Sequence, residues 1–349
     1  MSEVLRLNAT ERVLVLAPHP DDEAIACGGL LLAARAAGAA RRVVVVTDGD
    51  TNPWPQRWIE KRWRIDSAAR ARWGARRREE AQAALDVLGV DAGERCFFGL
   101  PDTGLTDLLM HDAEGLPARL REQIEEFQPT LIALPALEDR HPDHSAVHIV
   151  LRVALLRAGA TPRCLTYSVH GKAAQTSAAA FALDATWREQ KRTAIAQHAT
   201  QMRLSGKRFL AYADALERYH PMPAPPMVRA DHPLRAHFRS LSELELCLGA
   251  EYLRGRVRRL QLLVESEEQH LRWCLPFAPA GTGVTVTDES GRRVQDCQWR
   301  QRGGVLTASL QIAQSRLPRM GYAKVTRKRS DLLIFDRYGW QIIENSPAN

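Results

Sequence analysis

The chain has 349 residues, of which 45% are hydrophobic and 26% are charged. This length and composition indicate a globular protein of about two domains, and they exclude a disordered tail, a disulfide-stapled miniprotein and a collagen-like fibre. The net charge of +7 is concentrated in residues 51–78, which hold nine basic residues, two acidic residues and four of the eight tryptophans. The basic character therefore belongs to a local site or surface.

The absence of targeting signals and the spacing of the cysteines indicate the cell compartment and the type of metal ligand to expect. No run of 18 apolar residues predicts a membrane span, and the first residues lack the pattern of a secretory signal, so we expect a cytoplasmic protein. The six cysteines form no C-x-x-C pair, which excludes a zinc ribbon and a thioredoxin-type motif. Any metal must therefore be held by histidines and carboxylates.

The first two thirds of the chain alternate between strand and helix patterns. Apolar runs predict strands over Arg12–Ala17, Arg42–Thr47, Arg95–Leu100, Thr130–Leu134 and Arg163–Val169. Helical spacing predicts helices over Ala24–Ala37, Glu79–Leu88, Leu116–Phe127, Ser145–Ala158 and Trp187–Met202. This alternation predicts an α/β domain with a Rossmann-like, mostly parallel sheet covered by helices on both faces.

The composition changes after residue 219. Five prolines in His220–Pro233 predict a linker or an irregular cover. Beyond it, turn signals separate short strand-like runs at Leu244–Leu248, Arg256–Val264, His270–Leu275, Gly283–Thr287, Val305–Ile312, Gly321–Thr326 and Leu332–Phe335. We therefore predict three parts: an α/β domain over 1–219, a proline-rich linker over 220–233, and a smaller β-rich accessory domain over 234–349, such as a sandwich.

Two polar clusters follow predicted strands. The first is His19-Pro20-Asp21-Asp22-Glu23, and the second is Asp139-Arg140-His141-Pro142-Asp143-His144. Ligands of open α/β sheets bind outside the carboxyl ends of strands, so both clusters are expected at one edge of the sheet. Crowded carboxylates there need a cation or raised pKa values. The alternative interpretation is that each cluster is a turn whose aspartates only cap a helix.

Together the clusters offer the ligands of a metal site. His19, Asp22 and His144 form a set of two histidines and one carboxylate, and three protein ligands with an open position are typical of catalytic zinc. Asp21, His141 and Asp143 remain as nearby acid–base groups.

These two motifs resemble the PIG-L/LmbE-like family of zinc-dependent N-acetylglucosamine deacetylases. Weaker matches in family order are Thr47-Asp48-Gly49, Arg77-x-x-Glu80 before Leu88-Gly89-Val90, Phe98-Gly99-Leu100-Pro101-Asp102, and Lys191, Ala194, His198 and Gln201. The resemblance covers about residues 10–220. It does not account for the 51–75 insertion or for the chain after residue 234.

The resemblance implies a role for each matching residue. His19, Asp22 and His144 match the zinc ligands, and the metal is expected to exchange with other divalent ions. Asp21 matches the general base. His141 matches the group that stabilises the oxyanion and protonates the leaving amine, and Asp143 would orient it or tune its pKa. Two further positions, Arg77 and Asp102, match residues that hold the sugar.

The sequence thus predicts a zinc-dependent N-deacetylase that acts on an N-acetylated amino sugar in a glycan precursor or glycoconjugate. One alternative is a zinc amidase acting on another amide, such as a sugar–thiol conjugate. A second is a non-catalytic protein that binds acidic glycan or nucleic acid.

The basic, tryptophan-rich segment 51–78 allows three interpretations. It could be a lid whose indoles stack on sugars and whose arginines bind an anionic group of the substrate. It could equally be an exposed arginine-rich helix that its tryptophans anchor to the core. Nucleic-acid binding is the least favoured, because the segment lies close in sequence to the predicted site.

Overall fold

The computed structural model describes residues 3–171, 179–214, 216–223, 228–249, 257–266, 269–313, 316–327, 335, 336 and 338–345. The chain forms two compact units. The first comprises Met1–Leu105, Ala118–Asp139 and Asp143–Met222, and the second comprises Thr106–Pro117, Arg140–Pro142 and Pro223–Asn349. The accessory domain predicted to begin at residue 234 thus forms one unit with two short segments from earlier in the chain.

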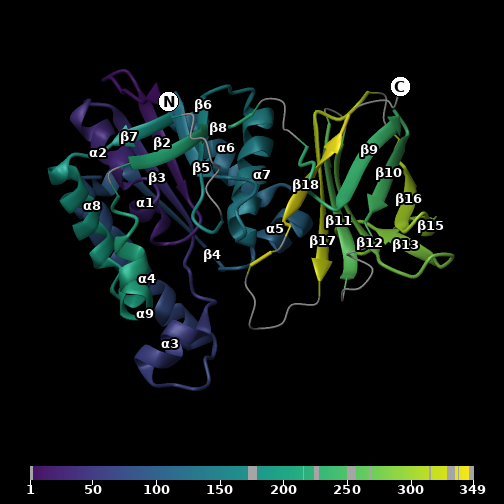
Figure 1. Ribbon diagram of the computed structural model, residues 1–349, viewed down its shortest axis with the longest axis horizontal. Coiled ribbons are helices and arrows are strands. Elements are labelled where there is room, and N and C mark those ends of the chain that lie inside the picture. Colours follow the sequence, from purple (N-terminus) through teal and green to yellow (C-terminus); the bar gives the residue numbers. More distant parts are fainter. Residues whose placement is uncertain are drawn as a thin grey trace. The chain divides into compact units, whose positions relative to one another are not determined.

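An eight-stranded sheet is the centre of the first unit, in the order β1-β7-β8-β6-β5-β2-β3-β4 (Figure 1). Its five central and edge strands β6, β5, β2, β3 and β4 pair in parallel, whereas β8 is antiparallel to both β6 and β7. The strand bounds are β1 Glu3–Val4, β2 Arg12–Ala17, β3 Ala40–Thr47, β4 Arg95–Leu100, β5 Leu131–Pro135, β6 Arg163–Tyr167, β7 Ala179–Ala182 and β8 Leu216–Pro221. The prediction of a mostly parallel α/β sheet is confirmed.

Helices cover both faces of this sheet, as Figure 1 shows. Strand residues Val13, Val15 and Ala17 of β2 pack into one apolar core with α2 and α4, and the alternate residues Leu14 and Leu16 are equally buried on the opposite face. The helix bounds are α1 Asp22–Ile25, α2 Gly28–Ala36, α3 Pro53–Glu60, α4 Ser67–Leu88, α6 Gly115–Phe127, α7 Pro142–Ala158, α8 Ala185–Gln197 and α9 Ala199–Leu210. No helix among the described residues is long and apolar enough to cross a membrane.

Two predicted helices are each divided in the structure. The helix predicted over Ala24–Ala37 breaks between α1 and α2, because the first backbone N–H groups of α2 have a partner of their own: Gly29 N and Leu30 N both donate to the Glu217 carboxylate at 2.8 Å. The helix predicted over Trp187–Met202 breaks between α8 and α9 at His198, whose ψ of 62° is not helical.

The second unit contains one ten-stranded sheet, in the order β14-β13-β12-β11-β17-β18-β9-β10-β16-β15. The bounds are β9 Leu234–Ser240, β10 Glu243–Leu248, β11 Val257–Glu265, β12 His270–Pro276, β13 Gly283–Thr287, β14 Arg293–Gln298, β15 Arg300–Arg302, β16 Val305–Gln311, β17 Met320–Arg327 and β18 Trp340–Glu344. The Gln295 side chain of β14 donates its Nε2 to the Gln311 carbonyl of β16 at 2.8 Å and accepts from Gln311 N at 3.0 Å. Because β14 and β16 lie near opposite ends of the strand order, the sheet curls nearly into a barrel. The prediction of a β-rich unit is confirmed, and a near-barrel takes the place of the sandwich.

Two segments of the second unit come from within the α/β part of the sequence. Arg272 in β12 donates its Nε to the Leu109 carbonyl of α5 (Leu105–His111) at 3.0 Å. Asp336 N donates to the Arg140 carbonyl at 2.8 Å, and the Phe335 ring lies 6.1 Å from the His141 ring, edge-on. The other residues of the strand predicted over Leu332–Phe335 lie outside the described residues.

Candidate metal and catalytic site

The two polar clusters meet because β2 and β5 are neighbouring parallel strands. The first cluster follows β2 and leads into α1, and the second follows β5 and leads into α7. His19, Asp22 and His144 are all buried, with exposed fractions of 6%, 1% and 0%. The predicted approach of the two motifs at the carboxyl edge of the sheet is therefore present in the structure.

Three potential ligand atoms form a nearly equilateral triangle. His19 Nδ1 lies 3.3 Å from Asp22 Oδ2, His144 Nε2 lies 3.2 Å from the same oxygen, and the two nitrogens are 3.3 Å apart. In a tetrahedral site with bonds of about 2.0–2.1 Å, ligand atoms are separated by about 3.3–3.4 Å. The triangle therefore has the dimensions of one face of a tetrahedral metal site, and the donor set of two imidazoles and one carboxylate fits zinc.

Further carboxylates orient both histidines of the triangle. Asp139 Oδ2 lies 3.2 Å from His144 Nδ1, the nitrogen that faces away from the triangle. Asp102 Oδ1 and Asp143 Oδ2 each lie 3.3 Å from His19 Nε2. Such carboxylate–histidine pairs fix the ring orientation and make the inward nitrogen a better metal ligand.

The electrostatics of the triangle favour a positive charge at its centre. Burial by itself would lower the pKa of His144, but the carboxylates of Asp139 and Asp22 raise it to about 10. Burial would raise the pKa of Asp22, yet His144 and His19 hold that pKa well below its ordinary value. Asp22 therefore keeps its negative charge although it is buried, which suits it to bind a divalent cation.

Metal-ligating geometry extends beyond the triangle. Two sets of buried side chains offer ligand atoms that all lie within 4.8 Å of one another, namely His19, His141 and His144, and His19, Asp102 and Asp143. The Asp143 carboxylate also accepts from Thr103 N at 2.6 Å and from Leu105 N at 3.1 Å, which ties the loop after β4 to the start of α7. His19 is therefore the residue common to every ligand set around this point.

Asp21 lies beside the triangle and is bound by Arg77. Arg77 Nη2 donates to Asp21 Oδ2 at 2.8 Å, while its Nη1 donates to the Gly49 carbonyl at 2.8 Å. A Cβ on Gly49 would come within 1.8 Å of Arg77 Nη1, so the close approach requires glycine. Burial raises the pKa of Asp21 to about 6, although Arg77 opposes this shift.

The sequence alone does not indicate the roles of Asp139 and His148. The only sequence signal for a role of Asp139 was its place in the second polar motif. In the structure, Asp139 Oδ2 also accepts hydrogen bonds from Val169 N and His170 N at 2.9 and 3.1 Å. His148 lies one turn after His144 on α7 and its Nδ1 lies 3.0 Å from the Pro135 carbonyl at the end of β5. Its helical spacing was compatible with ordinary packing.

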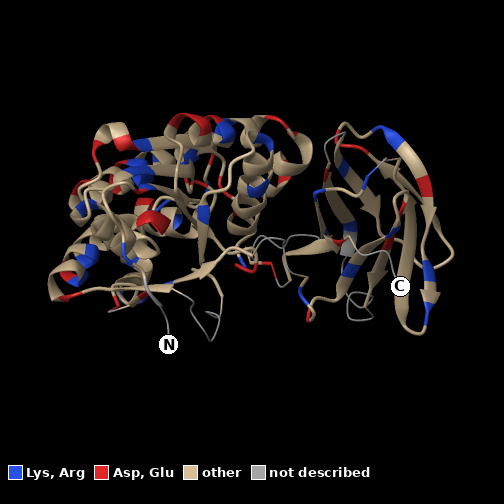
Figure 2. Cartoon of the chain, turned by 90° about the horizontal axis from the view of Figure 1, so that it is seen from above, with Lys and Arg blue, Asp and Glu red and all other residues tan. Residues whose placement is uncertain are grey.

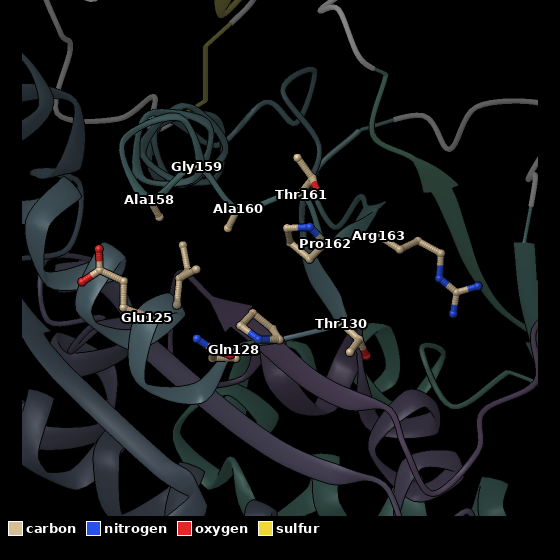
Figure 3. A pocket seen from close by; sticks show the side chains of 11 residues that line it. Glu125, Gln128, Thr130, Ala158, Gly159, Ala160, Thr161, Pro162 and Arg163 are labelled. Carbon is tan, nitrogen blue, oxygen red and sulfur yellow. The ribbon is translucent and has the colours of Figure 1, made fainter.

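A surface hollow of about 560 Å³ lies away from this chemistry (Figure 3). It is lined by the end of α6, by residues before β5 and by the segment that leads into β6, with Glu125 and Arg163 among its residues. These residues lie before β5 and at the start of β6, whereas the second polar motif follows the carboxyl end of β5, so the hollow belongs to the opposite edge of the sheet. The buried triangle, and not this hollow, is the candidate site.

Comparison with known proteins agrees with the site. Residues 14–155 match the model of the family described as "PIG-L: GlcNAc-PI de-N-acetylase", a range that contains both polar motifs. The match covers less than half of the chain, so it gives a similarity of this region to the PIG-L family. This match and the buried histidine–carboxylate cluster support a metal-dependent N-deacetylase, a hydrolase that acts on carbon–nitrogen bonds. The match bears out the predicted resemblance over this region and the predicted class of enzyme.

The solved structures that are similar to this chain are distant in sequence. A conserved protein from Thermus thermophilus is 22% identical with a TM-score of 0.47, and the match covers 64% of this chain and 98% of the Thermus chain. The zinc-inhibited form of teicoplanin deacetylase is 22% identical with a TM-score of 0.46, covering 58% and 90%. The diacetylchitobiose deacetylase from Pyrococcus horikoshii is 21% identical with a TM-score of 0.46, covering 62% and 85%.

Proposed function

We propose that this protein is a zinc-dependent hydrolase that removes the N-acetyl group from an N-acetylated amino sugar similar to N-acetylglucosamine. The triangle of His19 Nδ1, Asp22 Oδ2 and His144 Nε2 is the observation that supports this most strongly, because its edges of 3.2–3.3 Å suit a tetrahedral cation. His19, Asp22 and His144 are the proposed ligands. Zinc fits the donor set, and other divalent ions can replace it.

The proposed chemistry divides between the cation and the chain. A divalent cation held by His19, Asp22 and His144 would supply Lewis acidity, which would polarise the amide carbonyl and make water a better nucleophile. Asp21 is the proposed general base and accepts the proton of the attacking water. Its pKa of about 6 places this carboxylate close to the neutral range, in which a general base is most effective.

His141 is the proposed donor to the oxyanion and to the leaving amine. It belongs to one of the ligand sets that include His19 and His144, and it is 7% exposed. An imidazole near the developing oxyanion can donate a hydrogen bond and then protonate the amine. We assign Asp143 to orienting His141 or tuning its pKa. Asp143 also accepts hydrogen bonds from Thr103 N and Leu105 N, which supports a further role in positioning the loop after β4.

Arg77 and Asp102 are the proposed substrate-binding residues. Their contacts within the fold give each a second task, since Arg77 binds Asp21 and Asp102 lies against His19. We therefore expect substitutions at either position to affect turnover as well as substrate affinity.

Acetate release from defined substrates tests this proposal. The zinc-loaded chain would be assayed with N-acetylglucosamine, with its O-glycosides and with amides of a sugar–thiol conjugate, and both acetate and free amine would be quantified. Equal amounts of acetate and amine from the N-acetylglucosamine compounds are expected, and Asp21→Asn should remove this activity while retaining zinc. Hydrolysis of only the thiol conjugate would instead favour the amidase alternative, and binding without hydrolysis of any substrate would favour the non-catalytic alternative.

A further inference from the structure

Helix α3 presents an outward face that the deacetylase chemistry does not use. Pro55 and Gln56 are buried, and Gln56 Nε2 donates to the Ala69 carbonyl at 2.6 Å, which holds α3 against α4. Asn52 Oδ1 accepts from Trp54 N at 3.2 Å and caps the first turn. Figure 1 shows α3 at the far end of the first unit, beyond α4 and α9. The helix is therefore fixed on one side and open on the other.

Three tryptophans on α3 or just after its end are exposed. Trp54 is 47% exposed, Trp58 is 69% and Trp63 is 77%. Trp58 and Trp63 are the most exposed large apolar side chains among the described residues, and most of the others are leucines and valines. Of the four tryptophans in residues 51–78, Trp73 alone is buried. The interpretation that the tryptophans anchor the segment to the core therefore applies to Trp73 and not to the other three.

Basic side chains surround the exposed indoles. The Arg57 guanidinium lies 5.0 Å from the centre of the Trp54 ring and 5.3 Å from that of Trp63. Lys61, Arg62 and Arg64 are exposed, and within the described part of the chain no carboxylate forms an ion pair with them. Elsewhere basic and acidic residues are intermingled over both units (Figure 2). We call Trp54, Arg57, Trp58, Lys61, Arg62, Trp63 and Arg64 the tryptophan–arginine surface.

We propose that the tryptophan–arginine surface docks the protein on an anionic phospholipid membrane. Indoles prefer the headgroup region, where the ring is buried among acyl chains and the N–H stays hydrated. Unpaired cations beside them are attracted to anionic headgroups, and a short amphipathic helix with both features lies in the plane of the interface. The apolar and the electrostatic parts of the surface are thus complementary to the same partner.

The cation–π contacts favour a membrane over a nucleic acid or a glycan. Bases and sugars bind tryptophan by stacking on its flat face. The Arg57 guanidinium lies over the rings of Trp54 and Trp63, so it covers one face of each indole. Insertion into a lipid headgroup region uses the whole ring and needs no free flat face. The surface therefore fits a lipid interface better than a stacking platform.

Vesicle co-sedimentation of the full chain tests this proposal. Binding is expected to vesicles that contain phosphatidylglycerol, but not to vesicles of phosphatidylcholine alone, and salt should weaken it. Arg62→Gln with Arg64→Gln should lower the partition coefficient by about fivefold per charge removed. Trp58→Gln with Trp63→Gln should lower it further and should remove the quenching of tryptophan fluorescence by brominated lipids.

Matched controls come from the second unit. Arg300→Gln with Arg302→Gln removes two exposed charges at the same spacing, and Leu241→Gln removes an exposed apolar side chain outside the tryptophan–arginine surface. Both controls should bind anionic vesicles as the parent chain does. The proposal would be overturned by absence of vesicle binding, by equal loss in the control variants, or by tighter binding to a single-stranded oligonucleotide than to the vesicles. None of these readouts depends on deacetylase activity.

Discussion

The Arg77 guanidinium binds both the Asp21 carboxylate and the carbonyl of the preceding residue, Pro20. One guanidinium nitrogen, Nη2, donates to Asp21 Oδ2 at 2.8 Å and to the Pro20 carbonyl at 2.6 Å. Asp21 has a φ of 142°, a conformation that L-residues rarely adopt. Such strain persists at a functional position only where the surrounding contacts impose it. Arg77 therefore holds the proposed general base in a conformation that the chain would not otherwise keep.

Replacing Arg77 by Lys separates this positioning from sugar binding. Lysine cannot make all three bonds of the planar guanidinium, and losing a charged hydrogen bond costs about 1.5–3 kcal/mol. The kcat of Arg77→Lys should therefore fall about 10–100-fold with little change in zinc content. A rise in KM with unchanged kcat would show that Arg77 contacts the sugar and does not position Asp21.

Asp21→Asn tests the assignment of the base. The amide keeps the size of the side chain but cannot accept a proton at neutral pH, so kcat should fall by roughly 10²–10⁴-fold with a smaller change in KM. Zinc content should equal that of the parent chain. Asp231→Asn, at a side chain that is 83% exposed, is the matched control and should be fully active. Near-parental kcat in Asp21→Asn would move the role of base to another carboxylate.

Phe335→Ala tests whether the Phe335 ring positions His141. The Phe335 ring lies edge-on to the His141 ring, and the Arg140 guanidinium lies 5.9 Å from its centre. Aromatic pairs contribute about 0.5–1.5 kcal/mol, so the kcat of Phe335→Ala should fall about 2–10-fold while zinc is retained. Phe335→Tyr should restore most of it. A folded Phe335→Ala protein with full kcat would show that the ring does not position His141.

His148 predicts a loss of stability in acid. Burial, with a further contribution from Arg152, lowers the pKa of His148 to about 3, from an ordinary value of 6.5. Arg152 Nε donates to His148 Nε2 at 3.0 Å, so the native state favours the neutral ring. Between pH 6.5 and about 3, His148 is protonated in the unfolded state and neutral in the folded state. The contribution of the neutral His148 ring to the free energy of unfolding is therefore lost as the pH falls through this range.

Urea unfolding of His148→Gln measures this contribution. One proton changes the free energy of unfolding by at most about 1.4 kcal/mol per pH unit. The parent chain should therefore lose stability with a steeper slope than the variant as the pH falls below 6.5. Parallel slopes in the two proteins would show that His148 does not bind this proton on unfolding.

The sequence predicts the elements whose signal is local. β2 and β4 have the predicted bounds, because each is an apolar run between polar turns. The break between α1 and α2 was not predictable, since it depends on the Glu217 carboxylate, 188 residues from Gly29. The curling of the second sheet likewise depends on Gln295 meeting Gln311, which no local pattern encodes.

The candidate site was predictable to a similar extent. His19, Asp22 and His144 could be grouped because both motifs follow strands of one parallel sheet. The contacts that orient them could not, because Asp139, Asp102 and Asp143 reach the histidines through three-dimensional packing. Arg77 was predicted from family resemblance to hold the sugar, and its bond to Asp21 required the structure.

Zinc stoichiometry in ligand variants tests the central claim most directly, which is that His19, Asp22 and His144 hold the catalytic cation. The parent chain should bind one zinc, measured by elemental analysis and by calorimetric titration. Asp22→Asn and His144→Ala should lose it, Asp139→Asn should bind about 10–100-fold more weakly, and Asp231→Asn should bind as the parent does. Folded Asp22→Asn and His144→Ala proteins that each retain one zinc with parental affinity would contradict the account.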